Sequence, residues 1–122
     1  MLSSIVRLHH VTHNIVRSSV PAARRFYGEL LGLQEIRPLG DPQNERLIWF
    51  AVADQQLHLV LNDNCDARTS RHLAMLVRGF DDLVASLRES GVPLDPVKTR
   101  PDGSRVTWCY DPDGNRIELM EQ

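Results

Sequence analysis

Four residues of types that bind metal ions lie within short apolar segments of the sequence. His10, His58, His72 and Glu118 stand among β-branched or other apolar residues, in stretches such as QLHLVLN and RIELME. A titratable side chain inside a strand either faces water or needs a partner, because burying it alone is costly. His10 and His72 lie about 60 residues apart, as do His58 and Glu118, so the four occupy matched places in two halves of the chain.

Three imidazoles and one carboxylate form a suitable ligand set for a divalent ion. Zn, Fe, Mn, Ni and Co all accept such ligands, so the chemical type of the ligands does not identify the metal. The matched spacing predicts one metal site formed by His10, His58, His72 and Glu118. Taken singly, each histidine is also typical of a partly exposed strand residue. His9 and His13 lie on the opposite face of the predicted first strand from His10, or near the end of that strand. They are expected to be structural.

Other site chemistries lack their motifs. The chain has no Gly-x-Ser-x-Gly elbow and no glycine-rich phosphate loop. Cys65 and Cys109 have no CxxC spacing, so both are expected to be free thiols that pack in the fold. The segment DPDGN at 111–115 resembles the start of a calcium loop, but Arg116 and Gln122 stand where that loop needs glycine and glutamate. We expect a hairpin turn there.

The first half of the chain reads as β-α-β-β-β. Strands are predicted over 5–16, 33–38, 46–53 and 56–62. A helix is predicted over 20–31, because its apolar residues recur at steps of three and four. Ser18 and Ser19 offer a cap for this helix, Pro21 suits its first turn and Gly32 is placed to end it.

The second half repeats this order after a polar segment. Strands are predicted over 71–77, 92–99, 105–110 and 116–120, with a helix over 81–89. We therefore expect one domain over residues 1–122. It would consist of a first module at about 5–62, a linker at about 63–70 and a second module at about 71–121.

The composition is that of an ordinary soluble globular protein. The chain has 122 residues, of which 42% are hydrophobic and 25% are charged, and its formal net charge is -2. This charge gives no cationic field for nucleic acid. The apolar runs are far shorter than the roughly twenty residues of a membrane helix. The amino terminus lacks the features of a secretory signal, so the expected location is cytoplasmic, with no membrane partner.

The order of these segments resembles the vicinal oxygen chelate superfamily, which includes glyoxalase I, fosfomycin- and bleomycin-resistance proteins and extradiol dioxygenases. The resemblance rests on LHHV at 8–11, FYGELLGL at 26–33, QLHLV at 56–60, RHLAMLV at 71–77 and DPDGNRIELME at 111–121. It implies an α+β fold of two tandem βαβββ modules that form a curled mixed sheet around a metal pocket. It also implies a homodimer, in which modules of two subunits complete each site.

The same resemblance assigns the ligands by position. His10, His72 and Glu118 fall on metal-ligand positions, and His58 falls on a fourth-strand position that is usually glutamate in bacterial glyoxalase I. The interval between the first strand and the helix looks about two residues longer than usual. His13 or Thr12 therefore stays open as an alternative to His10.

The activity implied is that of a metal-dependent, glyoxalase-like lyase or isomerase acting on a small substrate with vicinal oxygens. Glu118 would be the base that moves a proton between adjacent carbons, and His58 would complete the metal shell or shuttle the proton. Glutathione is a possible cosubstrate, and its carboxylates would need cations such as Arg37, Arg46, Arg100 and Arg116. Expected substrate contacts are Asn62, Trp49, Trp108 and Met120.

Two alternatives remain open. His10, His72 and Glu118 would also suit an Fe(II) extradiol-type dioxygenase, with two histidines and one carboxylate on the metal. The third reading is a metal-free protein of the bleomycin-resistance kind, which binds a small molecule or an antibiotic. A binding groove alone has no need of four titratable residues in matched places, which favours an enzyme.

Overall fold

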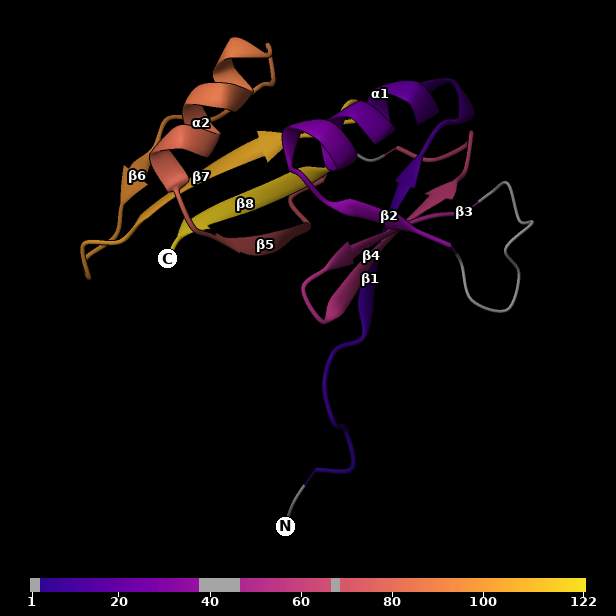
Figure 1. Ribbon diagram of the computed structural model, residues 1–122, viewed down its shortest axis with the longest axis horizontal. Helices are drawn as coiled ribbons and strands as arrows, with labels where there is room; N and C mark the ends of the chain where they lie inside the picture. Colours follow the sequence, from indigo (N-terminus) through magenta and orange to yellow (C-terminus); the bar gives the residue numbers. More distant parts are fainter. Residues whose placement is uncertain (1–2, 38–46, 67–68) are drawn as a thin grey trace.

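The computed structural model describes residues 3–37, 47–66 and 69–122. Two four-stranded mixed sheets make up the fold, each with a helix over one face (Figure 1). The strand orders are β1-β4-β3-β2 and β5-β8-β7-β6, so the two halves of the chain fold alike. The predicted α+β fold of two βαβββ modules is confirmed. Within the described part of the chain the two sheets stay separate rather than closing into one.

The first module supplies the first sheet. Its strands are β1 (His10–Ile15), β2 (Gln34–Ile36), β3 (Leu47–Val52) and β4 (Gln55–Leu61). Between β1 and β2 the chain forms a 3-10 turn (Arg17–Ser19), helix α1 (Val20–Arg24) and a π-helical turn (Arg25–Leu30). β1 pairs parallel with β4, and the other pairs of this sheet are antiparallel.

The second module repeats this arrangement. It contains β5 (His72–Val77), α2 (Phe80–Glu89), β6 (Lys98–Thr99), β7 (Arg105–Tyr110) and β8 (Arg116–Glu121). β5 pairs parallel with β8 as β1 does with β4. None of the helices in the described part of the chain is long and apolar enough to cross a membrane.

The predicted helix over 20–31 forms, but its second half has π geometry. Phe26 and Tyr27 are both buried in this turn, and Leu31 N–H donates to the Phe26 carbonyl over five residues, at 2.9 Å. Gly32 then adopts a positive φ of 73°, which ends the helix as predicted. Ser19 occupies the N-cap position of α1 as predicted, but its hydroxyl makes no capping bond and donates to Asp113 instead, at 3.1 Å.

Two predicted strands are shorter than expected. The strand over 5–16 forms only from His10, and the preceding segment extends away from the body of the molecule (Figure 1). The strand over 92–99 contracts to Lys98–Thr99, with an isolated bridge between Leu94 and Cys109. Pro93 and Pro96 explain this contraction, because proline has no N–H to donate to a ladder.

One face of each sheet packs into a single core. Residues of β1, β3, β4, β7 and β8 alternate between this core face and an open face, as strand geometry requires. The buried cluster combines α1-side residues such as Phe26 and Phe50 with α2-side residues such as Phe80 and Leu87. Both helices therefore cover the core, and the opposite faces of the sheets stay free for a site.

A buried polar network joins the two modules. Asp111, in the hairpin turn between β7 and β8, accepts hydrogen bonds from Tyr27 Oη and Asn115 Nδ2 at 2.7 and 2.8 Å. Asn115 Nδ2 also donates to the Asn14 carbonyl at 2.9 Å. The turn predicted at 111–115 is confirmed, with Gly114 N–H bonded to the Asp111 carbonyl. The FYGELLGL and DPDGN segments thus contact each other across the module boundary.

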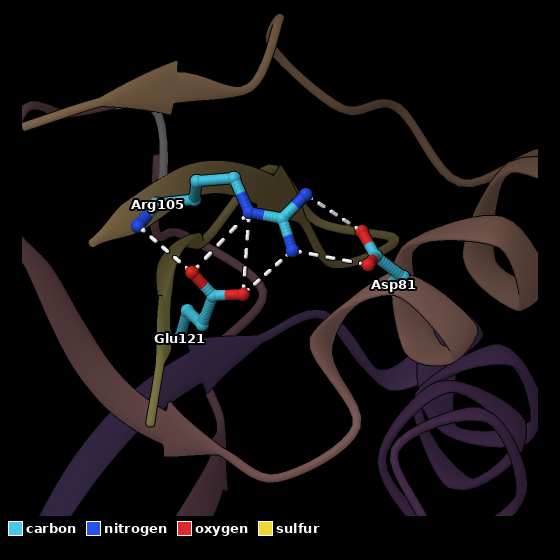
Figure 2. A network of polar contacts seen from close by, with 3 residues as sticks. All are labelled: Asp81, Arg105 and Glu121. Atoms are coloured by element: carbon cyan, nitrogen blue, oxygen red, sulfur yellow. Dashed lines mark hydrogen bonds and ion pairs between the residues drawn. The ribbon is translucent and has the colours of Figure 1, made fainter. Parts of the chain in front are cut away.

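A second network fastens α2 to its sheet (Figure 2). The Arg105 guanidinium donates to both carboxylate oxygens of Asp81 at 2.9 and 3.0 Å and to Glu121 at 2.6 Å. It also lies over the Phe80 ring, 5.2 Å from its centroid. These hydrogen bonds lower the pKa of Asp81 and of Glu121.

Arg105→Gln is expected to lower the melting temperature at neutral pH by roughly 2–5 °C, because α2 loses its attachment to β7 and β8. Because folding lowers the pKa of Asp81 and of Glu121, this stabilisation is fully present at pH values above the ordinary carboxyl pKa. It is lost as the pH falls through the lower pKa values of the folded state. The melting temperature, measured at a series of pH values, should therefore fall less steeply toward acid pH in the variant than in the wild type. The exposed Arg25–Glu29 pair gives the control: Arg25→Gln should barely shift the melt.

Candidate functional site

The open face of the first sheet gathers two histidines and a tryptophan. In the strand register Thr12 and Trp49 lie directly beside His58, on its two sides. His10 pairs with Gln56, two residues before His58, and so shares this face. The pairing from His10 to the end of β1 is uninterrupted, which places His10 and Thr12 on the open face.

The three rings form one stack. The Trp49 and His58 ring centroids are 3.8 Å apart with planes 2° apart, and His10 stacks on the far side of His58 at 4.0 Å. His58 is only 6% exposed as a result. Burial, followed by the neighbouring His10 and His9, lowers the pKa of His58 to about 4. His58 is therefore neutral at physiological pH and keeps a lone pair on its ring.

One nitrogen of His58 is already engaged. Nε2 lies 2.8 Å from Gln56 Oε1, so this nitrogen carries the proton and donates it to the amide oxygen. Nδ1 is then the nitrogen that can bind a metal ion or accept a proton. Gln56 thus fixes the tautomer of His58, a role that the sequence pattern did not reveal.

The open face of the second sheet carries an equivalent set at the same register. Trp108 and Ala74 lie beside Glu118, as Trp49 and Thr12 lie beside His58. His72 precedes Ala74 by two residues, as His10 precedes Thr12. The spacing that suggested matched places in the two halves therefore corresponds to matched positions in the two sheets.

Glu118 is buried and paired with a cation. The residue is 8% exposed overall, and Arg100 Nη2 donates to Glu118 Oε1 at 3.0 Å. His72 is exposed, and its Nδ1 lies 3.0 Å from the Ser70 carbonyl, which leaves Nε2 as the nitrogen able to bind a ligand. A metal ion at Glu118 would compete with Arg100 for the carboxylate.

The structure brings the four predicted ligands together only in part. His10 contacts His58, and His10 and His72 line one cavity of about 310 Å³ between β1 and β5. Neither His58 nor Glu118 lines that cavity. Among the described residues of a single chain, no three histidine, cysteine or carboxylate side chains come close enough to hold one ion.

The remaining predicted residues fall in different places. Trp49, Trp108 and Met120 lie half-buried on the open faces by register. Asn62 Oδ1 accepts from the Asn64 N–H at 3.1 Å, the arrangement of a residue that ends a strand. His13 lies on the core face with Nδ1 3.1 Å from Tyr27 Oη, which confirms a structural contact for it.

Of the four arginines expected to be available for an anionic substrate, two reach the open face. Arg100 pairs with Glu118, and the Arg116 guanidinium lies 4.8 Å from the Trp108 ring centroid. Arg37 is exposed after β2, and Arg46 lies outside the described residues. The sequence pattern missed Lys98, whose Nζ lies 5.5 Å from the same indole. Alternation along the predicted strand 92–99 could not have found it, because Leu94 bridges the core residue Cys109 whereas Lys98 pairs with Val106, on the same side as Trp108.

Comparison with known proteins agrees with the fold. The sequence profile of the Glyoxalase/Bleomycin resistance protein/Dioxygenase superfamily matches residues 7–119. The uncharacterized protein YwkD of Bacillus subtilis (strain 168) is 30% identical over 133 aligned positions, covering 94% of this chain and 96% of YwkD. A structure from Bacillus anthracis named for the glyoxalase family superposes with a TM-score of 0.88 at 29% identity, over 100% of this chain and 99% of that one.

A more distant structure shares the fold. Lactoylglutathione lyase from Agrobacterium tumefaciens superposes with a TM-score of 0.76 at 18% identity, over 98% of this chain and 96% of that one. The profile match spans both modules and all four predicted ligand positions. The chain belongs to the Glyoxalase/Bleomycin resistance protein/Dioxygenase superfamily.

Proposed function

We propose that this protein is a divalent-metal-dependent, glyoxalase-like lyase or isomerase, and that two copies of the chain assemble each site. His10 and His58 of one copy would face His72 and Glu118 of the other. The substrate would be a small molecule with vicinal oxygens, and the hemithioacetal of glutathione is the first candidate. Each chain would act as a single domain of two modules, at about 5–62 and 71–121.

The observation that carries this proposal is the equivalence of the two open faces. His10 and His58 occupy the same register positions as His72 and Glu118, yet one chain does not bring the two pairs into one cluster of its described residues. The combined donor set of imidazoles and one carboxylate, without thiolate, suits a divalent ion. Two chains joined about a twofold axis would form two such sites.

Exposed apolar side chains support a second copy. In the segment before β1, Ile5, Val6 and Leu8 are 78%, 93% and 72% exposed. Leu76, on the open face of the second sheet, is 64% exposed. Single exposed apolar residues are ordinary, but three within four positions are typical of a surface that another chain covers.

The roles of the residues follow from their surroundings. When bound, a divalent ion would hold the vicinal oxygens of the substrate and stabilise negative charge that develops on them. Glu118 would act as the base that takes a proton from one carbon and returns it to the next. Neutral His58 would bind through Nδ1 or pass the proton, because Gln56 occupies its Nε2. Trp49 and Trp108 would form apolar walls that exclude water.

Two assays on the metal-loaded protein separate this function from its alternatives. With the hemithioacetal of methylglyoxal and glutathione, we expect its absorbance to change as the thioester forms, without oxygen uptake. Oxygen consumption with catechols and iron would instead support the dioxygenase, which would use His10, His72 and Glu118. Tight binding of an antibiotic with no turnover and no metal would overturn the proposal in favour of a binding protein.

A further inference from the structure

We propose that the open face of the second sheet holds an anionic group of the substrate, through Lys98, Arg100 and Arg116 around Trp108. The substrate class is then a molecule with vicinal oxygens and a separate carboxylate or phosphate. The inference rests on the proposed function for the place of the vicinal oxygens. The anion site itself is defined by residues of this chain alone.

Three cations meet at one indole and one carboxylate. Arg116 and Lys98 lie over the Trp108 ring, at 4.8 and 5.5 Å from its centroid. Arg100 extends from the end of β6 to Glu118, the neighbour of Trp108 across the strands. Among the described residues, Glu118 pairs with Arg100, and neither Lys98 nor Arg116 forms an ion pair. Asp95, which accepts from Tyr110 Oη beside Arg116, and Asp102, which lies near Arg100, are the other carboxylates of this region. Lys98 and Arg116 therefore remain available to an added anion.

Two buried donors at this place have no acceptor. Trp108 Nε1 and Arg116 Nε are both shielded from water and lack a hydrogen-bond partner. A buried donor left unpaired costs free energy, so such groups in a working site are usually satisfied by a ligand or water. Both donors belong to side chains that contact each other. An oxygen-rich anion would supply the missing acceptors, and charge-assisted bonds to guanidinium are among the strongest available.

A second copy of the chain would not neutralise these cations. The described strand residues on the open face of the first sheet include no lysine, arginine, aspartate or glutamate. If that face of a partner covers the second sheet, it brings neutral rings and amides. A metal ion at Glu118 would also compete with Arg100 for that carboxylate. An anionic group of the substrate would then be a partner for these cations.

The test compares two probes that differ only in charge. Protocatechuate is a catechol with a carboxylate, and its amide presents the same vicinal oxygens without that charge. Calorimetric titration of the zinc-loaded and the metal-free protein gives the affinity of each probe. We expect the zinc-loaded wild type to prefer the carboxylate by about tenfold or more. Arg116→Gln and Lys98→Gln should bring the two affinities toward equality.

The Arg88→Gln variant and the titrations of the metal-free protein distinguish the anion site from the metal centre. Arg88→Gln removes the same charge from the exposed last turn of α2 and should keep the preference intact. Equal affinities for the two probes in the wild type, or an equal loss in Arg88→Gln, would overturn the anion site. Zinc dependence of both affinities tests the metal centre separately. A charge preference that survives without any zinc dependence would support the anion site and contradict the proposed function.

Discussion

Replacing Asp111 with alanine is expected to lower the free energy of unfolding by about 3–5 kcal/mol. Asp111 is 4% exposed, and its carboxylate accepts hydrogen bonds from the Tyr27 hydroxyl, the Asn115 amide and the backbone N–H groups of Asp113 and Asn115. Alanine would remove the acceptor that these four donors share, and only the Asn115 amide would keep another, the Asn14 carbonyl. Chemical denaturation monitored by tryptophan fluorescence measures the loss.

The other hairpin turn of the second module provides the control. Asp102 also accepts from the backbone two residues on, at 2.9 Å from Ser104 N, but it is exposed. Asp102→Ala should cost far less than Asp111→Ala, since water can replace the lost bonds. Tyr27→Phe should fall between the two variants, because it removes one donor of the buried network. Similar losses for Asp111→Ala and Asp102→Ala would mean that this network does not join the modules.

Replacing His72 with alanine is expected to weaken metal binding by at least about a hundredfold while leaving the fold intact. His72 is exposed, and its ring bonds the carbonyl of Ser70, only two residues away, so we expect the fold to tolerate its loss. Loss of a direct metal ligand should weaken metal binding more than loss of a group that only orients a ligand. Zinc affinity from competition with a chromogenic chelator measures the change.

His13→Gln is the matched control for this second experiment. His13 lies on the core face beside Tyr27, and burial lowers its pKa. Glutamine keeps a polar partner for the hydroxyl, so metal affinity should stay at the wild-type value. Should His13→Gln lose metal while His72→Ala retains it, the assignment of the ligands to the open faces would be wrong.

Much of the fold follows from local patterns in the sequence. Strand alternation, helix periodicity and the turn residues predicted two βαβββ modules, and the structure confirms them. The errors have one local and one distant origin. Proline at 93 and 96 prevents a ladder over most of 92–99, whereas the π turn at Arg25–Leu30 contains Tyr27, whose hydroxyl bonds Asp111 in the other module. A contact over 84 residues is not visible in the periodicity of one helix.

The candidate site was predictable as a set of positions but not as an arrangement. The equal spacing of His10 and His72, and of His58 and Glu118, pointed to equivalent places, and the register agrees. How the open faces meet depends on the packing of whole sheets, which residue spacing does not contain. The hydrogen bond from His58 to Gln56 and the pairing of Arg100 with Glu118 likewise follow only from the three-dimensional structure.

The central claim is that each metal site takes ligands from two chains, and mixing variant chains tests it most directly. Elemental mass spectrometry on untagged protein gives the metal content per chain for wild type, His10→Ala, His72→Ala and an equimolar mixture of both variants refolded together. We expect about one equivalent of metal in the wild type and very little in either variant alone.

The mixture should recover about a quarter of the wild-type metal, because half of the dimers are then mixed and each of these has one intact site. A site built within one chain would recover nothing, since every chain in the mixture lacks a ligand. Full metal content in both single variants, or none in the wild type after reconstitution, would contradict the account.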